Sequence, residues 1–105
     1  MTTAKIRQNG DIVRVAVQGH AGDPRICAAC CVLEQTLQQW LRDMGKGGAL
    51  ALYDDDVKEE TGDFYIKAKT KNVDDKVVAM LLGVIATGFM LLQEQYPDHV
   101  RLIYK

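Results

Sequence analysis

The sequence has no excess of charge of either sign. Thirteen lysines and arginines stand against fourteen aspartates and glutamates over 105 residues, which gives a net charge of −1 at pH 7. Both signs are spread along the chain, so no stretch has the basic character typical of proteins that bind nucleic acids or anionic membranes. We therefore expect neither a nucleic acid nor a membrane among the partners of this protein.

The sequence also lacks segments that would direct or anchor a protein outside the cytosol. Met1–Lys5 leads directly into a strand pattern, without the apolar region that precedes the cleavage site of a secretory signal. The longest apolar run without a charge, Val77–Leu92, has sixteen residues, fewer than the roughly twenty needed to span a bilayer. We expect a cytoplasmic protein in which this run forms a buried helix.

There is no disulfide framework, because the three cysteines are an odd number and fall within five positions, at Cys27, Cys30 and Cys31. A framework of disulfides would need cysteines spread across the fold. We expect reduced thiols. The chain also has no internal repeat, linker or low-complexity segment, so residues 1–105 are predicted to form a single domain.

Apolar periodicity predicts an α+β fold in which two helices pack on one mainly antiparallel sheet, in the order ββαββαβ. In the second strand the face with Val13, Val15 and Val17 is expected to meet the core. The predicted elements are a hairpin in Ile6–Val17 with a type I′ turn at Asn9-Gly10, a helix over Pro24–Met44, a hairpin of Ala49–Tyr53 with Phe64–Lys71, a helix from Asn72 to about Tyr96, and a strand at Val100–Tyr104.

Residues at the ends of the predicted elements indicate how each begins and stops. Asp23 is predicted to cap the first helix, with Pro24 at its first position, and Asn72 to cap the second. The acidic segment 54–63 lacks the alternating ligands and central glycine of a calcium loop, so it is predicted to be a solvated turn.

The stretch Gly19–Cys31 gathers all three cysteines and one of the two histidines. Cys27 falls in the first turn of the predicted helix, and thiolates are stabilised both by a helix N-terminus and by a nearby imidazolium. Six residues separate it from His20, and they include Gly22, so the imidazole can fold back toward the sulfur. One interpretation is therefore a Cys-His pair in which His20 takes the proton, Cys27 attacks a carbonyl, and backbone N–H groups at the helix start hold the oxyanion.

Three other interpretations of the same residues remain open at this point. The cysteines could simply fill the apolar start of a helix, which suits Cys30 well. They could bind zinc together with His20, although the adjacent Cys30 and Cys31 diverge by about 100° around a helix. Cys27 and Cys30 could also form a Cys-x-x-Cys redox pair, although a thioredoxin-like unit would follow this helix with a parallel crossover rather than a hairpin.

The residues Gly19-His20-Ala21-Gly22, followed by Ile26-Cys27-Ala28-Ala29 and Leu33–Leu37, resemble the signature of the ribosomal-processing cysteine protease Prp family. The resemblance covers essentially the whole chain. It implies a homodimeric endopeptidase that needs no metal or other cofactor and removes an N-terminal extension from a large-subunit ribosomal protein. By position, Cys27 matches the family's nucleophile and His20 its histidine.

The sequence departs from the family pattern at the loop before the nucleophile. The loop is shorter, and Pro24 stands three residues before Cys27 where the family commonly has aspartate, with Asp23 one residue earlier. Cys31 stands where the family often has serine. The resemblance implies substrate contacts at Gly19, Ala21, Gly22, Asp23 and Cys31. Since related proteins occur in bacteriophages, a phage structural protein is an alternative substrate, and a noncatalytic dimeric binding protein of the same fold is the alternative function.

The predicted second helix also bears on the oligomeric state. Its charge-free run is apolar nearly all round, which is more than a helix packed on one sheet can bury. A second copy related by a twofold axis would cover the excess. We therefore expect a homodimer with this helix at the interface.

Overall fold

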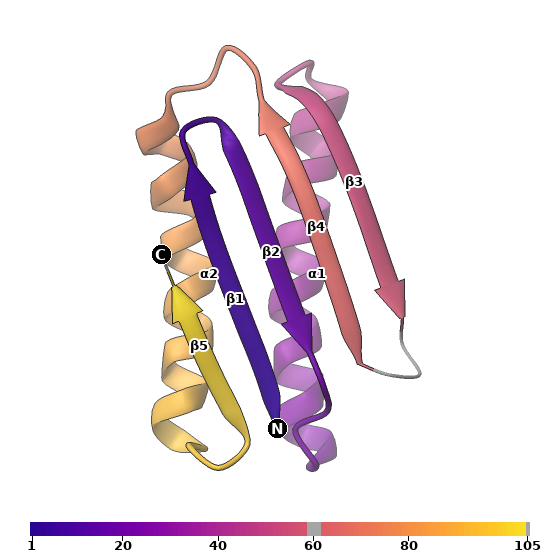
Figure 1. The fold of residues 1–105 in the computed structure, drawn as a ribbon, viewed down its shortest axis with the longest axis vertical. Coiled ribbons are helices and arrows are strands. Elements are labelled where there is room, and N and C mark those ends of the chain that lie inside the picture. The colour runs from indigo at the N-terminus through magenta and orange to yellow at the C-terminus, as the bar shows by residue number, and fades with distance from the viewer. Residues whose placement is uncertain (59–61, 105) are drawn as a thin grey trace.

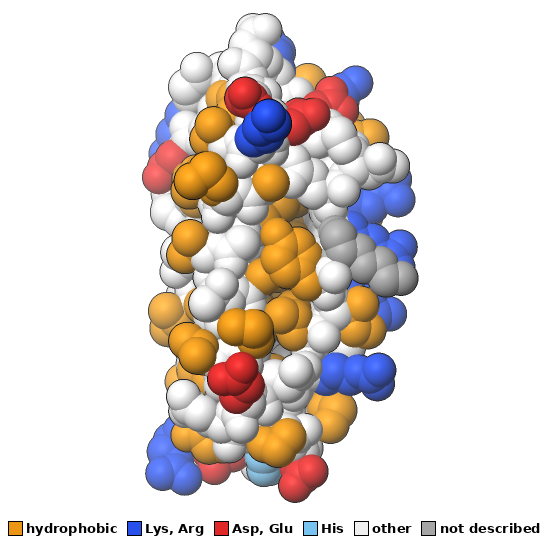
Figure 2. Space-filling view, turned by 90° about the vertical axis from the view of Figure 1, so that its left-hand side faces the viewer, with side chains coloured by type: hydrophobic (Ala, Val, Ile, Leu, Met, Phe, Trp, Pro, Cys, Tyr) orange, Lys and Arg blue, Asp and Glu red, His pale blue; other side chains and the backbone are white. Residues whose placement is uncertain are grey.

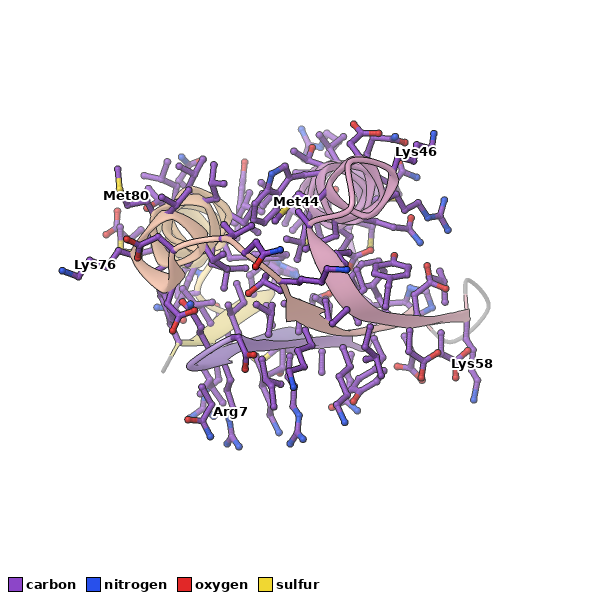
Figure 3. All side chains as sticks on the ribbon, turned by 90° about the horizontal axis from the view of Figure 1, so that it is seen from above. Arg7, Met44, Lys46, Lys58, Lys76 and Met80 are labelled. Carbon is purple, nitrogen blue, oxygen red and sulfur yellow. The ribbon has the colours of Figure 1, made fainter. Side chains whose placement is uncertain are left out.

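The computed structural model describes residues 1–58 and 62–104, and it confirms the predicted α+β fold with two helices on a five-stranded sheet (Figure 1). The strands lie in the order β3-β4-β2-β1-β5, with β5 parallel to β1 and the other neighbours antiparallel. Both helices cover the same face of the sheet (Figure 3). The elements are β1 (Thr2–Asn9), β2 (Ile12–Gln18), α1 (Pro24–Lys46), β3 (Leu50–Lys58), β4 (Asp63–Thr70), α2 (Asp75–Gln95) and β5 (Val100–Tyr104).

The core lies between the sheet and the two helices. Along each strand the buried residues alternate with residues on the open face, as the period of two requires. Val13, Val15 and Val17 are buried as predicted, and Val15 pairs with Ile6 on β1 and Ile66 on β4 in one row across the sheet. This row and its neighbours fix the register of the three central strands.

The first hairpin is present, but its turn differs from the predicted one. Asn9 pairs with Ile12, so it ends β1, and Gly10 and Asp11 form the turn. Gly10 has a φ of +62°, whereas Asn9 does not enter the positive-φ region that a type I′ turn with Asn9 and Gly10 at its centre would need. Strand pairing extends one residue further than expected and moves the turn along the chain.

Helix α1 begins as predicted, with Asp23 as its cap and Pro24 at its first position. The Asp23 carboxylate accepts a hydrogen bond from the Arg25 N–H at 2.8 Å. The helix runs to Lys46, two residues past the predicted end at Met44, and Gly47 caps it. The face that it turns to the core consists of Ile26, Cys30, Leu37 and Leu41.

Helix α2 begins at Asp75 with Asp74 as its cap, so the predicted cap at Asn72 was wrong. Asn72 has a φ of +59° and belongs to the turn before the helix, because Val73 and Asp74 must first cross from β4 to the helix layer. The predicted stripe packs against the sheet through Val78, Leu82, Ile85 and Phe89, with Leu92 partly buried.

One face of α2 carries exposed apolar side chains. By length and composition alone α2 could cross a membrane, but core helices of soluble proteins have the same length and composition. Here the opposite face of α2 packs on the sheet. Figure 2 shows hydrophobic side chains gathered over this side of the molecule. The exposed residues are Val77, Met80, Leu81, Val84, Met90 and Leu91.

The acidic segment after Tyr53 is not the predicted turn. Asp54, Asp55 and Asp56 continue β3 to Lys58, paired with β4, and the rest of the predicted turn falls partly on 59–61, outside the described residues. The edge position of β3 allows this, because charged side chains are tolerated and even useful at the edge of a sheet.

Candidate active site

A groove of about 770 Å³ lies beside the start of α1, between this helix and the β3–β4 hairpin. It brings together His20 and all three cysteines, residues that the sequence analysis placed in one stretch of chain. Its described lining consists of Thr2, Gly19, His20, Cys27, Cys30, Cys31, Glu34, Gln35, Gln38, Arg42, Asp55, Val57, Lys58, Gly62, Asp63 and Phe64.

The three cysteines line the groove from three different environments. The cap at Asp23 and the helix start at Pro24 make Cys27 the fourth residue of α1. Its side chain is half-buried. Cys30 is 3% exposed, and burial raises the pKa of its thiol to about 11. Cys31 is exposed. Within residues 1–58 and 62–104, no three His, Cys, Asp or Glu side chains are grouped as metal ligands would be.

His20 lies two residues beyond the end of β2, where two close approaches position it. Gly19 has a φ of +86°, and its carbonyl oxygen accepts a hydrogen bond from the Thr2 hydroxyl at 3.2 Å. Gly62, in the turn just before β4, lies directly against the imidazole. A Cβ added to Gly62 would stand 3.0 Å from both Cε1 and Nδ1 of His20, so only glycine fits there without a shift.

The predicted substrate-contacting residues separate into two groups. Gly19 and Cys31 line the groove, whereas Ala21, Gly22 and Asp23 lie outside its described lining. Ala21 is 2% exposed, and its carbonyl oxygen accepts a hydrogen bond from His99 Nδ1, on the side of β5. The start of the loop between His20 and Cys27 is therefore held at Ala21 against His99, just before β5.

The backbone N–H groups expected to hold an oxyanion already have partners. The Arg25 N–H donates to the Asp23 carboxylate at 2.8 Å, and the Cys27 N–H donates to the Asp23 carbonyl oxygen at 2.9 Å. Pro24 has no N–H. Hydrogen bonds from the Arg25 side chain and backbone also hold the pKa of Asp23 below its usual value, so this cap stays charged. These two backbone N–H groups are therefore engaged with Asp23 and not with a substrate.

An acidic anchor that the sequence analysis missed lies at the far end of the groove. Asp55 Oδ2 accepts hydrogen bonds from Gln38 at 2.9 Å, Tyr53 at 2.8 Å and Arg42 at 3.1 Å. These bonds, the one from Gln38 first, lower the pKa of Asp55. The anchor joins β3 to α1 within the lining of the groove. No sequence signal marks it, because the contact depends on β3 extending beyond Tyr53.

Glu34 is a second acidic group of the groove. It lies on the same face of α1 as Cys27 and Cys30, and burial raises the pKa of its carboxyl to about 7. In the described part of the chain the carboxylate has no hydrogen bond or ion pair. Its spacing of four from Cys30 and seven from Cys27 is the signal that could have placed it here.

Comparison with known proteins identifies the family of the chain. The family model of the cysteine protease Prp matches residues 1–101. The chain belongs to the cysteine protease Prp family. The resemblance found in the sequence is thereby confirmed, and membership in the Prp family makes the protein a cysteine protease. No match is found among curated protein sequences.

Solved structures with the Prp fold cover the whole chain. Two are the S. aureus ribosomal processing protease Prp, one with a covalently linked product peptide and one with a substrate peptide. They are 22% and 20% identical to this chain over 100% of both chains, each with a TM-score of 0.69. SMU.848 from Streptococcus mutans is 22% identical over 100% of this chain and 96% of its own, with a TM-score of 0.65. At these identities the structures establish the shared fold.

Proposed function

We propose that this Prp-family protease is an endopeptidase that uses Cys27 as nucleophile and His20 as general base and then acid. The observation that carries the proposal is that both side chains line one open groove, Cys27 from the start of α1 and His20 from the end of β2. A nucleophile and a base brought to one surface from two elements are what Cys-His catalysis requires.

The reaction can be written through this chain's own residues. His20 removes the proton from Cys27, and the thiolate sulfur forms a bond to the scissile carbonyl carbon. The C–N bond then breaks, and the amine leaves with the proton held by His20. Water, deprotonated by His20, attacks the thioester and releases the acid and the free thiol. Since the N–H groups of Arg25 and Cys27 are bonded to Asp23, we expect other donors to hold the oxyanion.

We propose that the substrate is a protein from which an N-terminal extension is removed, either a large-subunit ribosomal protein or a phage structural protein. The S. aureus Prp structures support a peptide substrate, since they hold a substrate peptide and a product peptide. Incubation of the purified protein with candidates of both kinds, with mass-spectrometric mapping of any new N-terminus, tests the assignment. Cleavage of neither kind by the wild-type protein, under conditions where it stays folded, would contradict it.

We also propose that the protein works in the cytoplasm as a homodimer. The support is the exposed apolar face of α2, where Met80 is 74% and Val84 68% exposed. Burying each side chain of this size would contribute on the order of 1 kcal/mol or more of favourable free energy, which is forgone while it remains in water. A twofold axis would let this face of α2 cover the same face of a second copy.

A further inference from the structure

The helices leave one face of the sheet open, the face turned toward the viewer in Figure 1. Cationic side chains gather on this face. Figure 3 shows Arg7 pointing away from the helix layer. The register places further lysines and arginines on the same side, because each alternates along its strand with buried core residues. We call this set the cationic face; it comprises Lys5 and Arg7 on β1, Arg14 on β2, Lys67 and Lys69 on β4, and Arg101 on β5.

Three members of the cationic face form a row of like charges. Arg7 stands directly opposite Arg14, and Arg14 directly opposite Lys67. Like charges in directly opposed positions of a sheet are destabilising. Among the described residues, no acidic side chain lies within ion-pair distance of any of the three, whereas Lys69 lies 4.0 Å from Asp11. Asp54 of β3 stands directly opposite Lys67 in the same row, so Arg7 and Arg14 carry the positive potential that an external anion can neutralise.

The distribution of charge on this face favours a linear polyanion over a flat anionic surface. The cations follow β5, β1, β2 and β4, while Asp54 and Asp56 occupy the same side of the edge strand β3. A membrane would bring its phosphates against these carboxylates as well. A single nucleic-acid strand can follow the cations, which are spaced by about 4.8 Å across strands and about 6.8 Å along them, and avoid β3.

An aromatic ring lies within the same set. Tyr65 is 40% exposed and lies on β4, two residues before Lys67 and opposite Ala16 of β2. Unpaired bases stack on exposed aromatic rings and on arginine guanidinium planes, and an open sheet face is a common platform for this. Tyr65 beside Arg14 and Lys67 thus offers stacking as well as charge.

We propose that the cationic face binds single-stranded nucleic acid. The near-zero net charge predicts no such partner, but it averages over the whole chain and does not describe the central strands β1 and β2, where Lys5, Arg7 and Arg14 lie. The cationic face is separate from the groove. The groove is lined by α1 and by helix-facing residues of β3 such as Asp55 and Val57. Nucleic-acid binding and proteolysis can therefore occur together, and the proposal does not depend on the substrate of the protease.

Fluorescence anisotropy with end-labelled oligouridine and oligothymidine of about twelve nucleotides tests the proposal, and comparing the two separates RNA from DNA. We expect saturable binding at about 50 mM salt that weakens steeply at about 200 mM. The double variant Arg7→Gln/Arg14→Gln should weaken binding about tenfold and reduce the slope of log K against log salt by about 1.4, because single strands lose about 0.7 per phosphate contact.

The matched control is Lys46→Gln/Lys76→Gln, which removes the same charge from the two helices (Figure 3). It should change the affinity less than about twofold. Tyr65→Ala should weaken binding without changing the salt slope, because it removes stacking and no charge.

Removal of the like-charge pair should leave the melting temperature of Arg7→Gln/Arg14→Gln unchanged or raise it, so lost binding will not reflect unfolding. Absence of saturable binding at about 50 mM salt, equal losses in both double variants, or binding to phosphatidylserine vesicles in place of the oligonucleotides would each overturn the proposal.

Discussion

Three cysteines on adjacent turns of α1 are expected to differ strongly in reactivity. Cys27 lies in the first turn of α1, lines the groove together with His20 and is the proposed nucleophile, whereas Cys31 lies one turn further along and is exposed. Cys30 is buried, with a pKa of about 11. At pH 7, iodoacetamide followed by peptide mapping should label Cys27 first, Cys31 more slowly and Cys30 last. Equal and slow labelling of all three thiols would favour a noncatalytic binding protein.

Glu34 should make the stability of the protein depend on pH. Burial raises its pKa from 4.5 to about 7, so the folded state binds this proton more tightly than the unfolded state. The contribution of this proton to the free energy of unfolding is complete below pH 4.5 and is lost as the pH rises through 7. Glu34→Gln should therefore raise the free energy of unfolding at pH 8 by about 1 kcal/mol, discounted for partial exposure, and change it little at pH 4.

Urea unfolding at both pH values measures this effect. Glu94→Gln, at an exposed position on α2, is the matched control and should change neither value. A gain from Glu34→Gln of the same size at pH 4 as at pH 8 would mean that the charge of Glu34 is not the cause.

Gly62 can be tested as a residue that positions His20. Gly62→Ala strains a φ of +72° and places a Cβ 3.0 Å from the imidazole, so it should lower kcat/KM by about tenfold or more. Gly48→Ala is the control, because Gly48 has a φ of +79° and a Cβ added there would meet nothing within 4 Å. Gly48→Ala should lose about 1 kcal/mol of stability from backbone strain, and Gly62→Ala should lose more, because its Cβ would also stand 2.8 Å from the Gly19 carbonyl oxygen. An unchanged kcat/KM in Gly62→Ala would contradict the role of Gly62 in positioning His20.

At the scale of elements, the sequence predicts what depends on local periodicity. The valine face of β2, the Asp23 cap and the apolar stripes of both helices follow from residues close in the chain, and the structure has them. The placement of Asn9 and of the acidic end of β3 depends on pairing with β2 and β4, which local propensity does not contain. The α2 cap was misplaced because three residues in Asn72–Asp75 can each cap a helix.

The same distinction holds for the active site. His20 and Cys27 could be predicted because seven positions separate them along one loop and helix start. Gly62 and Asp55 could not, since they reach the groove only through the β3–β4 hairpin. Long-range packing therefore supplies Gly62 beside His20 and Asp55 in the lining of the groove, while the short motif supplies the proposed reacting pair.

At the scale of the whole molecule, the exposed face of α2 predicts a homodimer. Sedimentation equilibrium at micromolar concentration should give twice the monomer mass of 11.7 kDa. Val84→Lys should shift the protein toward monomer, because Val84 is 68% exposed in the single chain and a lysine would lie in the interface. Thr36→Lys adds the same charge at an exposed position of α1 and should leave the dimer intact. A soluble wild-type monomer would contradict this account.

The central claim is that Cys27 is the nucleophile of this protease and that its neighbours are not. It is tested most directly by measuring kcat/KM for a cleaved protein substrate with the wild type, Cys27→Ala and Cys31→Ala. Because the proposed reaction passes through a thioester on Cys27, Cys27→Ala should lower kcat/KM by at least about a thousandfold with its folded spectrum unchanged, while Cys31→Ala stays within about tenfold of the wild type. Cleavage by Cys27→Ala at the wild-type rate, or its loss only in Cys31→Ala, would contradict the account.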